Sequence, residues 1–324
     1  MSSPSRSYLR RRVGQYLHHT ELMLGTTILG LYVLLALVAW IYYRGGLSSM
    51  EFHIRVMAYG PSPPTISFFP FSLGPYTLGQ TGLFGFNVLE GLIKATPWDL
   101  MLFAGIIIPT CLIGLVIGVV AGGTGSFVDD ALMTFTDVIL SVPPFVVALL
   151  VFVVILPGLP TSQAPLLFVA AMILINWAPY ARVVRARART IASKPFVEAA
   201  AASGAGRLRI LFRHILPNSY SPMLSQVPIT LANLIIILTV IPYVGIETSQ
   251  QYINVVSFMP AINFPEWTWI LVNGMIGFSP IISTNAWWAY TFPFLCIFAF
   301  GLGVQLFCDG LEDYLSPQSG SRTH

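Results

Sequence analysis

The sequence predicts an all-α membrane protein with six transmembrane helices. Of the 324 residues, 55% are hydrophobic and only 9% are charged, whereas soluble domains carry about a quarter charged residues. The apolar residues gather into segments of roughly 20 residues, the length at which a helix crosses a bilayer. The basic residues gather between particular pairs of these segments, and their distribution predicts how the chain is oriented.

Six segments are long and apolar enough to cross a membrane. The first is too long for the core of a signal peptide and has no small-residue cleavage site after it, so we expect it to be retained. Proline and glycine within the segments are compatible with spanning, because neighbouring helices satisfy the backbone groups that are freed. The expected spans are 22–43, 99–121, 131–156, 164–184, 223–244 and 287–307.

The basic residues predict that both ends of the chain are cytoplasmic. With the N-terminus inside, only Arg44, Arg55 and Lys94 of the 16 Lys and Arg fall outside, as the positive-inside rule requires. The expected organisation is a cytoplasmic segment 1–21, the span 22–43, an extracytoplasmic segment 44–98, a five-helix core 99–308 and a cytoplasmic tail 309–324. Within the core lie a cytoplasmic loop, 185–218, and an extracytoplasmic segment, 245–286.

The two outer segments are rich in aromatic residues. Tryptophan favours the boundary between membrane and water, so the simplest interpretation of these tryptophans is that they anchor the protein at this boundary. The alternative is that the outer segments form a lid or a docking surface for an extracytoplasmic partner. The residues concerned are Trp267, Trp269, Trp287 and Trp288.

The 185–218 loop predicts two short helices. The run EAAAA at 198–202 favours a helix, and Gly204 and Gly206 then interrupt it. A second helix follows, at whose end Pro217 is expected to stop it. Its apolar residues recur at the spacing of one helix face; they are Leu208, Leu211, Phe212 and Ile215, with Arg209 and Arg213 off that face. This unit fits either a lipid-surface helix or a docking surface for a soluble partner.

Four stretches of the sequence resemble one family of transporters. The loop VEAAAASGAGRLRILFRHILPN resembles the EAA loop of ABC importer permeases, in the form found in the C-type subunit of the dipeptide, oligopeptide and nickel permease family. Three further stretches are similar to the same family: GVVAGGTGSFVDDALMTFTDVILSVPPF (118–145), NWAPYARVVRARARTIASKPFVEAA (176–200) and FCDGLEDYLSP (307–317). The resemblance implies the type I ABC importer permease fold.

The resemblance also implies how such a chain works with other chains. Its EAA loop is expected to dock on an ATPase subunit, so that closure of two ATPases drives the change between inward- and outward-facing states. The partners implied are a second homologous permease, two ATPase subunits that bind ATP and Mg²⁺, an extracytoplasmic substrate-binding protein and membrane lipid. The positions carried over to docking are Glu198, Ala199, Ala200, Gly204, Arg209, Arg213, Leu216 and Pro217.

Two alternatives stay open for the charged residues of the loop. Glu198 either pairs with a basic group of the ATPase or simply stabilises the first turn of its helix. Arg209 and Arg213 reach either acidic residues of the partner or lipid phosphates. The substrate also stays open: peptides are usual in this family, and oligosaccharides or nickel complexes are the alternatives. One departure from the family pattern lies before the second span, where Phe86 and Asn87 replace an Arg-Asp pair.

Acidic residues in or near the spans have structural roles in our interpretation. Asp137 is expected to hold the cytoplasmic end of the third span rather than to bind substrate or protons, and Asp99 is expected to begin the second span, where it suits the helix dipole. The three cysteines, Cys111, Cys296 and Cys308, are expected to be buried as small hydrophobic residues.

No residue pattern indicates catalysis, a metal site or a cofactor on this chain. The five histidines form no metal-ligand spacing, and no phosphate-binding GxxxxGK[ST] loop is present. The small net charge of +3 gives no indication of nucleic-acid binding. A secondary transporter would show paired, interrupted helices in two repeated halves, and an intramembrane enzyme would need paired acids or a metal cluster. Neither pattern is found, so the expected protein is a transporter subunit and not an enzyme.

Overall fold

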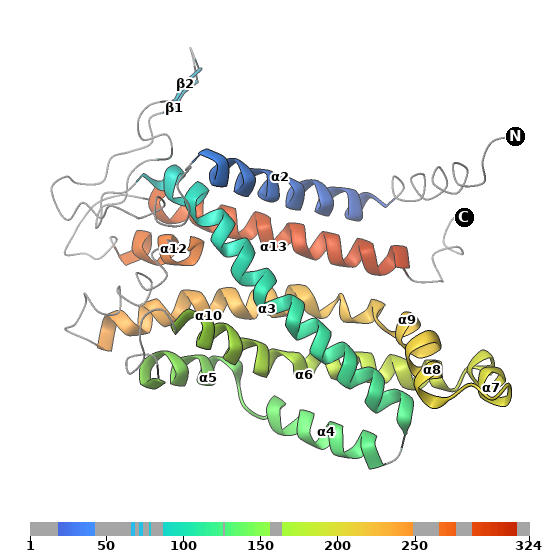
Figure 1. Ribbon diagram of the computed structural model, residues 1–324. Coiled ribbons are helices and arrows are strands. Elements are labelled where there is room, and N and C mark those ends of the chain that lie inside the picture. The colour runs from blue at the N-terminus through green and yellow to red at the C-terminus, as the bar shows by residue number, and fades with distance from the viewer. Residues whose placement is uncertain are drawn as a thin grey trace, which may run out of the picture.

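The computed structural model of the chain is a bundle of long, roughly parallel helices (Figure 1). It describes residues 19–42, 66–68, 71–73, 78, 87–125, 127–155, 164–248, 266–276 and 287–315. Several residues used in the orientation argument lie outside these ranges, namely Arg6, Arg10, Arg11, Arg12, Arg44, Arg55 and Arg322, as does Phe86.

The first and last helices pack against each other along most of their length. These are α2 (Thr20–Tyr42) and α13 (Trp288–Leu315), which lie side by side at one edge of the bundle (Figure 1). Glycines make the close approach possible: a Cβ at Gly310 would lie 2.5 Å from the backbone nitrogen of Leu22, and a Cβ at Gly25 would overlap the backbone of Phe307.

Helix α3 (Val88–Thr124) crosses the bundle diagonally and is longer than the predicted second span (Figure 1). It begins well before 99 because Asn87 caps it: the Asn87 side-chain oxygen accepts hydrogen bonds from the backbone N–H groups of Leu89, at 3.1 Å, and Glu90. The expected 44–98 segment therefore ends in helix. At 37 residues α3 is about 55 Å long, well over a bilayer core of about 30 Å.

Helices α3 and α6 (Ala164–Ala192) form the most extensive contact of the bundle. Glycine recurs at every fourth position near the end of α3, at Gly114, Gly118 and Gly122, on the face that meets α6. A Cβ at Gly118 would lie 2.6 Å from the carbonyl oxygen of Ala181, and one at Gly122 would lie 2.5 Å from that of Arg185. Small residues at this spacing let two membrane helices approach at backbone distance.

The predicted third span, 131–156, is not one straight helix. Its residues fall in α4 (Phe127–Leu140), α5 (Pro144–Leu150) and a π-helical turn η2 (Val151–Ile155), and α4 and α5 meet at a bend of 64°. The bend follows from two consecutive prolines: Pro143 precedes α5, and Pro144 occupies its first turn. Five helices of the described residues are long and apolar enough to span, and the predicted six is reached when the bent pair counts as one.

The remaining long helices place most of the predicted interfacial tryptophans inside the protein. Helix α10 (Gln226–Thr248) and the short helix α12 (Trp267–Ile276) pack with α3 and α13 around the main apolar core. Trp267, Trp269 and Trp288 are buried in that core, and only Trp287 is exposed. The interpretation of the first three as anchors in the membrane interface is therefore wrong, because protein rather than lipid surrounds them.

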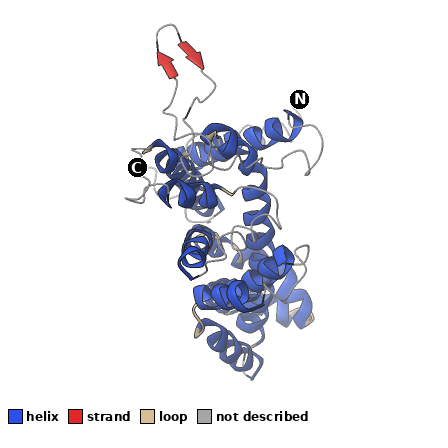
Figure 2. Cartoon of the chain, turned by 90° about the vertical axis from the view of Figure 1, so that its left-hand side faces the viewer, coloured by secondary structure: helices blue, strands red, loops and turns tan. Residues whose placement is uncertain are grey.

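One small element departs from the predicted all-α fold. Strands β1 (Ile66–Phe68) and β2 (Phe71–Leu73) pair in antiparallel fashion, with Ser67 opposite Ser72 (Figure 2). They belong to the aromatic, proline-rich part of the predicted outer segment.

Candidate functional site

The chain between α6 and α10 forms a compact group of short helices at one end of the bundle (Figure 1). We call residues 195–219 the end segment. It contains α7 (Pro195–Ala202), α8 (Arg207–Ile210), the π-helical turn η4 (Leu211–Ile215) and α9 (Leu216–Ser219). A short 3₁₀ turn, η5 (Ser221–Met223), then leads to α10.

Helix α7 presents the predicted EAA residues on the outside. Pro195 occupies its first turn, where a missing N–H has no cost. Val197 is buried and packs α7 against the bundle, while Glu198 and Ala199 are exposed and Ala200 is half-buried. An acidic side chain in the first turn stabilises the helix dipole. The carboxylate of Glu198 has no ion pair among the residues that the structure describes, and a partner can reach it.

Gly204 ends α7 in a conformation that suits glycine. Its φ is +82°, and its N–H donates to the carbonyl of Ala201 at 3.0 Å, while the N–H of Ala205 donates to the carbonyl of Ala200 at 3.1 Å. These two bonds make a Schellman motif, in which the residue after the C-cap adopts the left-handed region. A Cβ at Gly204 would meet nothing within 4 Å, so backbone conformation rather than space selects glycine here.

The helix after the turn does not bury the whole apolar face predicted for it. Leu211 and Ile215 are 4% and 1% exposed, but Leu208 and Phe212 are 72% and 55% exposed. The π-helical geometry of η4 widens the turn and changes which residues share a face. The predicted single face is therefore wrong: one pair of residues faces the protein, and the other pair faces outward together with the exposed side chains of Arg209 and Arg213.

Pro217 does not stop the helix, contrary to the prediction. It lies in the first turn of α9, and helical structure continues to Ser219. Side chains supply bonds around the proline: the Asn218 amide donates to the carbonyl of His214, and the Ser219 hydroxyl donates to that of Ile215, both at 2.7 Å. Leu216 is half-buried and Pro217 is exposed.

A small apolar cluster attaches the end segment to the bundle. It joins residues of α7 and η4 to the ends of α3 and α6, and a Cβ at Gly123 of α3 would overlap the Leu211 side chain. Displacement of the end segment therefore acts directly on two long helices. The cluster consists of Val119, Val184, Ala188, Ile191, Val197, Leu211 and Ile215.

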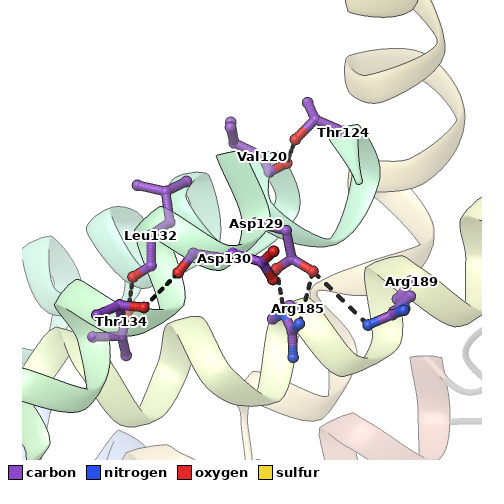
Figure 3. A network of polar contacts seen from close by, with 9 residues as sticks. Val120, Thr124, Asp129, Asp130, Leu132, Thr134, Arg185 and Arg189 are labelled. Atoms are coloured by element: carbon purple, nitrogen blue, oxygen red, sulfur yellow. Dashed lines mark hydrogen bonds and ion pairs between the residues drawn. The ribbon is translucent and has the colours of Figure 1, made fainter. Parts of the chain in front are cut away.

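An ion pair holds the first turn of α4 against the same stretch of α6 (Figure 3). Arg185 donates two hydrogen bonds to the Asp129 carboxylate, from Nε at 2.5 Å and from Nη2 at 2.7 Å. Nη1 of Arg189 lies 3.8 Å from the same carboxylate. The Asp129 side chain is only 6% exposed. Two parallel bonds to one carboxylate fix direction as well as distance, so α4 is fixed in register with α6.

Asp137, the acid singled out in the sequence, lies in a more open position. It forms an ion pair with Arg182 of α6, and the side chains are 60% and 58% exposed. Exposed pairs of this kind contribute about 0–1 kcal/mol. Sequence reasoning gave Asp129 no role, although its spacing to Asp137 places both on one side of α4.

The outer surface of the end segment combines apolar and basic groups. Phe196, Leu208 and Phe212 are exposed large apolar side chains, and Lys194, Arg207, Arg209 and Arg213 are exposed next to them in sequence. Exposed apolar groups beside charges of one sign are typical of surfaces that bind another protein or a membrane. Within the described part of the chain, no three His, Cys, Asp or Glu side chains gather as for a metal ion.

Comparison with known proteins identifies the family. Residues 114–317, more than half of the chain, match the family described as binding-protein-dependent transport system inner membrane component. The chain belongs to this family. It is accordingly the permease subunit of an ABC importer, a multi-pass protein of the plasma (inner) membrane, and not an enzyme. Permeases of this kind work with ATPase and substrate-binding partners.

Curated relatives of this permease carry peptide-transport names. It is 25% identical to a di/tripeptide transport system permease protein of Pseudomonas aeruginosa, over 76% of this chain and 72% of the relative. It is 26% identical to a dipeptide transport system permease protein of Haemophilus influenzae, over 75% and 74%. It is also 26% identical to a putative peptide transport system permease protein of Brucella abortus, over 93% of this chain and 89% of the relative.

Proposed function

We propose that this chain forms part of the translocation path of an importer for di- or oligopeptides and that its end segment couples the path to ATP hydrolysis on separate subunits. The observation that carries the coupling is the two-sided construction of the end segment. Leu211 and Ile215 root it in α3 and α6, while Leu208 and Phe212 present an apolar surface outward. The names of the relatives support peptides as the substrate class.

The complex that we propose contains a second, homologous permease, two ATPase subunits with ATP and Mg²⁺, and an extracytoplasmic binding protein. In the coupling step, the exposed apolar side chains enter an apolar groove of the ATPase, and the surrounding arginines face acidic groups at its edge. Glu198 meets a basic group of the same partner. When two ATPases close on ATP, each end segment is displaced, and the apolar cluster transmits the displacement to α3 and α6.

A pair of matched charge insertions tests the docking surface. Leu208→Glu places an acid within the exposed apolar surface, whereas Thr190→Glu makes the same charge change at an exposed position on α6, outside the end segment. Buried charges without partners are costly, so we expect Leu208→Glu to reduce co-purification of the ATPase subunits at least tenfold. Thr190→Glu is expected to leave their yield unchanged. Equal recovery with both variants would contradict docking through this surface.

The substrate class is tested on the binding protein recovered with the complex. Binding of di- and tripeptides, but not of oligosaccharides or nickel complexes, measured by calorimetry, is the expected result. Binding of a sugar or a nickel complex alone would overturn the peptide assignment and leave the coupling assignment intact.

A further inference from the structure

Two carboxyl groups are buried together at the end of the bundle opposite the end segment. Asp99 is 0% exposed and Glu266 is 3% exposed. Asp99 does not begin a helix, as the sequence suggested, but lies inside α3. Glu266 directly precedes α12, and the Asp99 side chain reaches the backbone of Trp267, the next residue along the chain.

Asp99 caps α12 across a long sequence separation. Its Oδ2 accepts a hydrogen bond of 2.9 Å from the backbone N–H of Trp267, the first residue of α12. The Trp267 ring adds a second contact with α3, because its Nε1 donates to the carbonyl of Leu92 at 3.3 Å. The start of α12 is therefore attached to α3 through both backbone and side chain.

The other oxygens of the pair are poorly satisfied. Asp99 Oδ1 is buried and has no hydrogen-bond partner. Glu266 Oε2 accepts one long bond, 3.4 Å, from the Thr268 hydroxyl. A fully ionised carboxylate in such surroundings lacks the hydrogen bonds that its two oxygens need.

No basic side chain compensates these two acids among the residues that the structure describes. The ion pairs there join Lys94 to Glu90, Arg182 to Asp137, and Arg185 and Arg189 to Asp129. The titratable groups of the surrounding helices are also acids: Cys296 and Tyr290 of α13, and Tyr32 of α2, whose hydroxyl donates to the carbonyl of Cys296. The described side chains of α10 include no titratable group.

We propose that Asp99 and Glu266 form a proton-binding site, which keeps at least one proton at neutral pH and thereby holds the start of α12 against α3. Two carboxylates without a cation repel each other in a low-dielectric interior, and retaining a proton removes the repulsion. The proton also gives the unpartnered Asp99 oxygen a role, as carrier or acceptor of that proton. The two groups titrate as a pair.

The pair makes the attachment of α12 weaken as the pH rises. Burial in an apolar site raises the pKa of the Glu266 carboxyl above its ordinary value. In an opened state that pKa returns to about 4.3. Ionisation therefore adds no cost in acid, where the pair is protonated in both states, and its cost grows as the pH rises above about 4.3. The attachment of α12 is consequently weaker at higher pH.

Two measurements on the full-length chain in lipid nanodiscs test this. Infrared spectroscopy at neutral pH is expected to show the carbonyl stretch of a protonated carboxyl group. The double variant Asp99→Asn with Glu266→Gln should remove that band, whereas Glu90→Gln, a matched change on the exposed side of α3, should retain it. Absence of the band in the wild type, or its persistence in the double variant, would overturn the proposal.

Hydrogen exchange of the α12 amides provides the second measurement. After correction for intrinsic rates, wild-type protection should fall about tenfold or more between acid and mildly alkaline pH, since each unit of pKa shift corresponds to a tenfold change. The double variant Asp99→Asn with Glu266→Gln, in which both replacements have nearly the same size as the originals, should abolish the fall. A wild-type protection factor that does not change with pH contradicts the site, and this titration requires no variant to fold.

Discussion

At the scale of single residues, Gly204 is a position where backbone conformation, and not lack of space, requires glycine. Its φ is positive, and nothing lies within 4 Å of a Cβ built on it. Gly206, two residues on, also has free space around it but has an ordinary φ of −64°. The two glycines therefore form a natural pair for experiment.

We expect Gly204→Ala to disturb the turn and Gly206→Ala to leave it intact. An L-residue in the left-handed region costs about 1–2 kcal/mol, so exchange of the amides at the end of α7 should accelerate roughly tenfold in Gly204→Ala, and ATPase stimulation by substrate should fall. Gly204→Asn should recover part of the loss, since asparagine tolerates this region. Equal effects of the two alanine variants would show that conformation at Gly204 is not what couples the end segment.

Asp129 offers a second prediction at this scale, with its neighbour as the control. Asp129→Asn removes the charge held by two nitrogens of Arg185, and we expect a loss of about 2 kcal/mol in stability, the magnitude of a charged hydrogen bond in a partly buried site. Asp130→Asn changes an exposed acid of the same turn and should alter stability little. Thermal unfolding in nanodiscs measures both, and the prediction fails if they unfold at the same temperature.

At the scale of elements, the α3–α6 contact depends on glycines that a side chain cannot replace. Gly118→Leu would place its Cβ 2.6 Å from the carbonyl oxygen of Ala181, whereas a Cβ at Gly105 on the same helix meets nothing within 4 Å. Backbone cannot move aside as a flexible side chain can. We therefore expect Gly118→Leu to abolish stable folding, seen as loss of the monodisperse detergent-solubilised protein, and Gly105→Leu to be tolerated. Stable Gly118→Leu protein would refute close helix contact there.

Sequence reasoning located these elements better than it described their contacts. Hydropathy alone places the long helices, because a spanning segment must be apolar over a defined length. Hydropathy could not show that the chain bends at 141–143, since prolines are tolerated within spans. Sequence periodicity could not distinguish buried from exposed residues in the end segment, because the π-helical turn η4 shifts the helical register. The start of α3 was missed because its first turns carry Glu90 and Lys94, whose mutual ion pair offsets their charges.

At the scale of the whole molecule, the distribution of basic residues predicts which end of the bundle faces the cytoplasm. Ser203→Cys, in the exposed turn of the end segment, should react with a membrane-impermeant maleimide only after the membrane is opened. Trp287→Cys, exposed at the opposite end, should react in intact cells. The native cysteines Cys111 and Cys308 are buried and Cys296 is half-buried, so the background is expected to be low. The reverse labelling pattern would invert the topology.

The family and the loop that we propose for coupling could be recognised from the sequence, while the acid pair could not. Glu198, Gly204 and the residues around them lie in one continuous motif, so their order along the chain is itself the signal. Asp99 and Glu266 are separated by about half of the chain, and only folding brings Trp267 to Asp99. A sequence contains no spacing that indicates such a contact.

Helix α3 is long enough to contact α12 near one end and the end segment near the other. Near one end, its residues Leu92 and Asp99 hold Trp267, and near the other, Gly123 receives Leu211. A helix held at both ends moves both contacts when it tilts as a unit, and Pro97 and Pro109 are the points at which α3 can bend instead. With a length of about 55 Å, a swing of roughly 10° about its midpoint carries each tip about 5 Å in opposite directions. A tilt of α3 as a unit therefore displaces α12 in the direction opposite to the end segment.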